Sequence, residues 1–235
     1  MLAVVPACAS DDPQPVERPA TSTAVTAPTT AAPATTEPEP TPPADRPGSG
    51  SSDGTPVVIG IRLERWSQDG TEGFEELLVD TLLDPRGWTQ AGFEFRFAED
   101  APYRVVVAEG PDVDATCAPY TTGGEYSCQI GPIVALNAER WREATPTWTG
   151  TLDDYRRMLV THEVGHLIGR HHARPACGSP GEPAAVMWQQ SAGLDGCAPN
   201  PWPLPWEVAC AARHDEPIAP PYEPDARATC GPDDV

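Results

Sequence analysis

The strongest constraint on this chain is one eleven-residue segment, His162 to His172, that reads H-E-x-x-H-x-x-G-x-x-H. His162 and His166 are four residues apart, so a helix places both imidazoles on one face, one turn apart. Gly169 can adopt a positive φ, end that helix and turn the chain back. His172 can then bring a third imidazole to the same point. Three nitrogens with one position left open are the ligand set of a catalytic zinc ion.

Glu163 directly follows the first histidine. At this spacing its carboxylate can accept a proton from a zinc-bound water instead of binding the metal. We expect His162, His166 and His172 to bind Zn²⁺ as neutral imidazoles, with Glu163 as general base in the attack of that water on a peptide carbonyl. The expected activity is that of a zinc metalloendopeptidase. His171 is the rival third ligand, since only the spacing of the pattern favours its neighbour.

The residues before the motif predict the helix that carries it, over residues 152–168. Thr151 and Asp154 form a T-x-x-D start, which is close to a capping box. Apolar side chains recur at helical spacing and would face a core. They are Met158, Val164, Leu167 and Ile168.

Further elements are predicted upstream. Residues 57–61 form a continuous apolar run, residues 93–97 alternate as in a half-buried strand, and residues 103–108 read as another strand. A helix is expected from residue 74 and should stop before Pro85. Residues 129–136 read as one strand interrupted by Gly131 and Pro132, which suits a sheet edge. A peptide substrate could pair with residues 133–137 of this edge, or a loop could cover it.

The motif resembles that of the metzincin zinc peptidases. Those enzymes carry a methionine turn beneath the metal, and Met187, fifteen residues after His172, matches that methionine. Taken alone, Met187 would be read as a core side chain. Astacin-like and serralysin-like members have a tyrosine two residues after the methionine, where this chain has Gln189. The resemblance therefore does not extend to a tyrosine-assisted mechanism.

A closer resemblance, over residues 55–206, is to a family of metzincin-like actinobacterial secreted proteins that carries a domain-of-unknown-function label. It rests on Tyr155-Arg156-Arg157, Pro183-Ala184-Ala185-Val186-Met187, Gln189-Gln190, Gly196-Cys197 and Asn200-Pro201-Trp202-Pro203. The resemblance implies an α+β, metzincin-like zincin fold with a mixed twisted sheet, an active-site helix and an irregular C-terminal part held by disulfides. It also implies zinc, but no particular substrate.

The chain has seven cysteines. With Cys8 set aside, six remain, and an even number suggests three disulfides formed outside the cytosol. Six cysteines allow fifteen pairings. Nearest neighbours are the simplest assignment, which gives Cys117–Cys128, Cys177–Cys197 and Cys210–Cys230. Cysteine ligation of zinc is the alternative, but the chain has no C-x-x-C pair.

The N-terminus resembles the end of a bacterial lipoprotein signal, because a short apolar run precedes Cys8, the candidate for lipidation. A plain fragment of a secretory signal is the alternative. Residues 9–54 are rich in proline, threonine and alanine with few large apolar side chains, so we expect a disordered tether. The predicted organisation is a partial signal over 1–8, that tether, a catalytic domain over 55–215, and a proline-rich tail over 216–235.

The net charge of −20 argues against nucleic acid as a partner, because nothing would neutralise phosphates. The sequence has no run of about eighteen apolar residues that would span a membrane. We expect a monomer outside the cytoplasm, secreted or lipid-anchored in the envelope, that acts on peptides or proteins. Two alternatives remain: a non-catalytic zinc-binding envelope lipoprotein, and a zinc amidase acting on cell-wall amide bonds.

Overall fold

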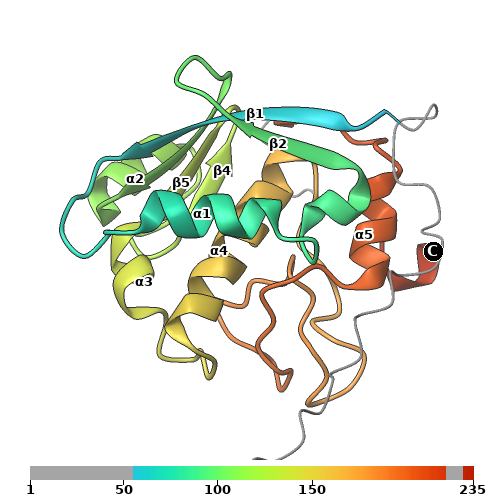
Figure 1. The fold of residues 1–235 in the computed structure, drawn as a ribbon. Helices are drawn as coiled ribbons and strands as arrows, with labels where there is room; N and C mark the ends of the chain where they lie inside the picture. The colour runs from blue at the N-terminus through green and yellow to red at the C-terminus, as the bar shows by residue number, and fades with distance from the viewer. Residues whose placement is uncertain (1–54, 221–229) are drawn as a thin grey trace, which may run out of the picture. The chain divides into compact units, whose positions relative to one another are not determined.

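Five short, largely apolar segments pair into one mixed sheet in the computed structural model, which describes residues 55–220 and 230–235 (Figure 1). The strands are β1 (Val57–Arg65), β2 (Phe93–Phe97), β3 (Tyr103–Ala108), β4 (Cys128–Ile130) and β5 (Ile133–Asn137). Their order is β2-β1-β3-β5-β4; β4 alone is antiparallel to its neighbour, and the other pairs are parallel. The mixed sheet agrees with the predicted α+β class.

Alternation along the strands separates two buried faces of the sheet. Val105 and Val107 of β3 belong to the main hydrophobic core, whereas Val106 and Ala108 belong to a second cluster on the opposite face. The main core also receives α1 (Phe74–Leu83) and α4 (Leu152–Leu167), and the second cluster receives α2 (Gly110–Cys117). The motif helix α4 is therefore fixed against one face of the sheet.

Two more helices and two 3-10 turns complete the described part of the fold. They are α3 (Ala138–Glu143), α5 (Pro205–Ala212), and the 3-10 turns η1 (Trp88–Ala91) and η2 (Pro232–Asp234). The helix α4 begins where predicted, because the Thr151 hydroxyl accepts a hydrogen bond from the Asp154 N–H at 3.1 Å. Strands β2 and β3 have the predicted bounds. Helices α2, α3 and α5 were not predicted.

The prediction of a single strand over residues 129–136, with residues 133–137 at a sheet edge, is wrong. Gly131, at φ +49°, and Pro132 reverse the chain, so that β4 and β5 form a hairpin in which Cys128 pairs with Ala135. Strand β5 therefore lies between β3 and β4, and its backbone is already paired on both sides. The end strand of the sheet here is β4.

Three disulfides join the cysteine pairs that are nearest in sequence: Cys117–Cys128, Cys177–Cys197 and Cys210–Cys230. The first ties the end of α2 to the start of β4. The second closes a loop in residues 168–204, which contain no helix or strand apart from one isolated bridge. The third links α5 to the residue before Gly231 and η2.

Several predictions concern residues that are not described. Cys8, the partial signal, the tether over 9–54 and residues 221–229 of the tail lie outside the described residues. Within residues 55–220 and 230–235, no helix is both long and apolar enough to cross a membrane.

The start of α4 gives a first prediction. Thr151→Ala should lower the free energy of unfolding of the full-length protein by about 1 kcal/mol, because the Asp154 N–H loses its acceptor. Thr151→Ser keeps the hydroxyl and should unfold like the parent. Urea unfolding followed by circular dichroism measures both, and an alanine variant as stable as the serine variant would contradict the cap.

Candidate metal centre

The end of α4 determines where the motif histidines lie. The helix stops at Leu167, and Gly169 takes φ +88°, a conformation that side chains with a Cβ rarely adopt. A Cβ at position 169 would also lie 2.6 Å from the Glu216 Cβ and 2.9 Å from the Pro217 carbonyl oxygen. Glycine is thus needed here for the turn and for the close passage of a later segment.

The turn brings three imidazoles together. Ligand nitrogens of His162, His166 and His172 all lie within 4.8 Å of one another. The Nε2 atoms of His166 and His172 are 3.2 Å apart. A tetrahedral zinc ion with Zn–N bonds of about 2.05 Å holds two nitrogens about 3.3 Å apart, so this separation suits a shared metal. His171, the rival ligand, is not part of the group.

Backbone carbonyls orient two of these rings. The Nδ1 of His162 is 2.7 Å from the Val186 oxygen, and the Nδ1 of His166 is 2.6 Å from the Arg170 oxygen. A carbonyl can only accept, so each Nδ1 carries the hydrogen and each Nε2 keeps its lone pair for a metal. Desolvation, with a smaller effect of the neighbouring rings, lowers the pKa of all three imidazoles to about 3. Neutral imidazole is the form that binds zinc, so the donor set fits this metal.

Glu163 is 5 % exposed and lines the same cleft as the three histidines. Burial raises the pKa of its carboxyl to about 8. The structure therefore places one buried carboxyl group in the lining of the cleft that also contains the three imidazoles.

Met187 directly follows the residue whose carbonyl bonds His162, and it is 2 % exposed. A Cβ on Gly165 would overlap the Met187 sulfur and would approach the Trp88 ring to 3.1 Å. The motif helix therefore rests directly on the methionine, and glycine at 165 permits the contact. This packing is compatible with the methionine turn that the resemblance implies.

Glu207, which the sequence did not single out, holds the methionine segment. Its carboxylate is 2 % exposed and accepts hydrogen bonds from the N–H groups of Val186 at 3.0 Å, Met187 at 2.8 Å and Leu204 at 2.8 Å. Burial raises its pKa to about 7, while the three N–H donors oppose that rise. The peptide group between Val186 and Met187 therefore donates to Glu207 through the Met187 N–H and accepts from His162 through the Val186 carbonyl.

The cleft above the histidines has a volume of about 440 Å³. Its lining includes residues of the 120–129 segment and the run Gln189, Gln190, Ser191 and Ala192, and we call these two groups the walls of the cleft. Gln189, at the position of the metzincin tyrosine, is exposed in this wall, whereas Gln190 is fully buried and bonded to the Asn200 backbone at 2.8 and 3.0 Å. An open cleft leaves space for a substrate at the metal-binding nitrogens.

Comparisons with known proteins agree with the span of the predicted resemblance. Residues 55–205 match the model of a family described as protein of unknown function (DUF3152). A comparison with curated proteins gives no match. Among solved structures, the chain is similar to the crystal structure of archaemetzincin from Methanopyrus kandleri, with 12 % identity and a TM-score of 0.42, over 72 % of this chain and 97 % of that chain.

Glu207→Gln tests the support of the methionine segment. It replaces one acceptor oxygen by an NH₂ group that faces backbone N–H donors, so we expect a loss of about 2 kcal/mol of unfolding free energy and about tenfold weaker zinc binding. Glu76→Gln, on the exposed side of α1, is the control. Urea unfolding and competition with a chromophoric chelator provide the measurements; unchanged zinc affinity would show that Glu207 does not support the site.

Substitution of two glycines can separate the cost of backbone strain from the cost of steric crowding. Gly169 and Gly181 have φ +88° and +85°, but no atom lies within 4 Å of a Cβ built on Gly181. Gly181→Ala should cost about 1 kcal/mol of stability through φ alone. Gly169→Ala should cost about 3 kcal/mol and also weaken zinc binding at least tenfold, because His172 is displaced. Equal effects of the two substitutions on zinc affinity would refute this reading of the turn.

Proposed function

The chain belongs to the DUF3152 family, and we propose that it is a zinc-dependent hydrolase that cleaves peptide bonds. The observation that carries the proposal is the convergence of three imidazole nitrogens beside a buried carboxyl group at the base of an open cleft. A purely structural zinc site would be closed by a fourth protein ligand and would not need the carboxyl group.

His162, His166 and His172 would hold the metal through their unprotonated nitrogens. Two of the rings are already oriented by the Val186 and Arg170 carbonyls, so little rearrangement is needed on binding. When bound, zinc supplies Lewis acidity that polarises a carbonyl group and makes a water molecule more acidic. Met187 has a structural role beneath the ligands.

Glu163 would move the proton. Burial favours the neutral carboxyl, and the positive charge of a bound zinc ion would favour the carboxylate. In that ionised form an oxygen of Glu163 accepts a proton from the attacking water and then donates it to the nitrogen of the leaving amine, so the group returns to its starting form. The peptide C–N bond breaks, and one water is consumed per bond. Its buried position beside His162 keeps the carboxyl group within the low-dielectric base of the cleft.

The end strand β4 offers a way to orient an extended peptide. Cys128 and Gln129 of β4 line the cleft, and β4 ends the sheet on this side. A substrate strand could add to β4 through backbone hydrogen bonds and cross the metal-binding nitrogens. This proposal replaces the expectation that residues 133–137 would receive the peptide.

The three disulfides support a location outside the cytoplasm, where such bonds form and persist. Lipidation at Cys8, a membrane attachment and a monomeric state remain predictions.

Glu163→Gln tests the proposed function. The full-length variant should keep one zinc per chain but cleave an unfolded protein substrate at least about 10²-fold more slowly, since general acid–base catalysis contributes about that much. His172→Ala should lose both zinc and activity. Zinc content by atomic emission and product formation by mass spectrometry, with and without chelator, are the measurements.

The outcome also separates the alternatives. Cleavage by Glu163→Gln at the parental rate would remove Glu163 from the mechanism. A parent that holds zinc but cleaves neither unfolded proteins nor cell-wall peptides would favour a non-catalytic metal protein. Cleavage of cell-wall amide bonds alone would identify an amidase.

A further inference from the structure

One wall of the cleft is a fixed loop that carries no ionised side chain toward the cleft. We call residues 118–127 the cleft loop. It contributes Tyr120, Thr121, Thr122, Tyr126 and Ser127 to the lining. The chain as a whole has a net charge of −20. Among the described lining residues, the histidines aside, Glu163 and Arg170 alone have ionisable side chains that are charged in water at neutral pH. The cleft wall is thus uncharged in a strongly acidic protein.

The cleft loop is closed by a disulfide between the residues that flank it and is held at its middle by one carboxylate. The disulfide Cys117–Cys128 closes the loop at its base. From α2, the Asp114 carboxylate accepts hydrogen bonds from two residues of the loop. The donors are the Thr122 N–H at 3.1 Å, the Thr122 hydroxyl at 2.8 Å and the Gly123 N–H at 3.1 Å. These contacts fix the middle of the loop to helix α2.

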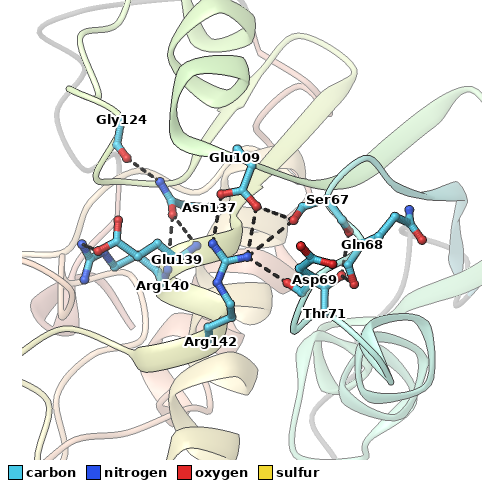
Figure 2. Close-up of polar contacts among 10 residues, drawn as sticks. All are labelled: Ser67, Gln68, Asp69, Thr71, Glu109, Gly124, Asn137, Glu139, Arg140 and Arg142. Atoms are coloured by element: carbon cyan, nitrogen blue, oxygen red, sulfur yellow. Dashed lines mark hydrogen bonds and ion pairs between the residues drawn. The ribbon is translucent and has the colours of Figure 1, made fainter.

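Asn137 fixes the second half of the cleft loop, as Figure 2 shows. It is fully buried at the end of β5, and its Nδ2 donates to the Gly124 carbonyl at 2.7 Å. Its backbone N–H donates to the Ser127 hydroxyl at 3.0 Å. Its Oδ1 accepts from the Glu139 and Arg140 N–H groups at 2.9 and 3.2 Å, which caps α3. One side chain therefore joins the helix cap to the loop.

Arginines of α3 extend this network to the ends of the parallel strands. Arg140 donates from Nε to the Glu125 carbonyl at 3.1 Å. Arg142 pairs with both carboxylate oxygens of Glu109, at 3.0 and 2.9 Å, and donates to the Asp69 carbonyl at 2.9 Å (Figure 2). The cleft loop is consequently anchored to the segments that follow β1, β3 and β5.

The cleft loop carries an exposed aromatic side chain. Tyr126 is 42 % exposed although it lies in the cleft lining. Burying an aromatic ring against another apolar group is favourable, and a ring that is already held in place loses little conformational entropy on binding. An uncharged wall offers no partner to an ionised substrate side chain, so such a side chain would lose its hydration without compensation and bind less well.

We propose that the cleft loop selects the substrate: Tyr126 binds an aromatic or large apolar side chain, and Asn137 is a positioning residue that holds Tyr126 toward the cleft. The proposal rests on the proposed function, since it assumes that the cleft receives a peptide. It names the substrate class as extended polypeptide with a bulky uncharged residue near the metal-binding nitrogens.

The test measures peptide binding, so it does not need cleavage. Full-length Glu163→Gln protein loaded with zinc is titrated with labelled ten-residue peptides of alanine, glycine and serine in which one phenylalanine, aspartate or serine is moved along the chain. Fluorescence anisotropy gives the Kd. We expect the best phenylalanine peptide to bind about tenfold more tightly than its serine or aspartate counterpart.

Variants in the same background locate the preference. Tyr126→Ala should reduce the tenfold preference to about twofold or less, whereas Tyr126→Phe, which keeps the ring, should retain it. Leu83→Ala, which removes an exposed apolar side chain of α1 outside the cleft, should retain it as well. Asn137→Asp keeps the acceptor for α3 but loses the donor to Gly124, so it should reduce the preference without changing zinc affinity.

The outcomes separate this proposal from the proposed function. Loss of the preference in Tyr126→Ala, with no cleavage by the zinc-loaded parent chain, would uphold the cleft-loop proposal and reject hydrolysis. A parent that cleaves peptides while Tyr126→Ala keeps the full preference would overturn the cleft-loop proposal alone. Absence of binding by every peptide, or equal binding of aspartate and phenylalanine peptides, would overturn it too.

Discussion

The hydrogen bond from His162 Nδ1 to the Val186 carbonyl connects the two parts from which the candidate site is built. On one side is α4, packed against the sheet; on the other is an irregular segment with almost no secondary structure of its own. The N–H of the same peptide group, that of Met187, donates to the buried Glu207 carboxylate. The His162 ring, a loop peptide group and α5 are thus linked in series, and a shift of the loop would turn the ring.

This dependence explains why the irregular part contains so many specific contacts. Residues 168–204 lack the backbone ladders that hold a helix or a sheet, so their position must come from other interactions. The Cys177–Cys197 disulfide, the Glu207 carboxylate and the Gln190–Asn200 hydrogen bonds provide them. Even the turn at Gly169 is packed by residues 216 and 217, which come from much later in the chain.

The sequence predicted the features that depend on neighbouring residues and missed contacts between residues that are far apart in the chain. The bounds of α4 and the bend at Gly169 follow from spacing, a cap and a glycine within one short segment, and the structure agrees with them. Glu207 lies 20 residues from its partner Met187, and a single sequence gives no signal for such a contact. The Pro205 and Glu207 positions could have indicated a helix start, but not where the carboxylate points. The β4–β5 reversal was missed because Gly131-Pro132 also suits an edge strand.

The two walls of the cleft are stabilised by separate sets of interactions. The three candidate metal ligands depend on α4, the Val186–Met187 segment and Glu207, whereas the cleft loop depends on Asp114, Asn137 and the Cys117–Cys128 disulfide. The hydrogen bonds named here for one set share no residue with those named for the other, and the two sets meet through the packing of α4 against β4 and β5. Because energetic coupling between groups that share no partner is small, metal affinity and substrate preference should vary independently. The chemistry at the histidines could therefore stay constant while changes in the cleft loop altered which peptide is held above them.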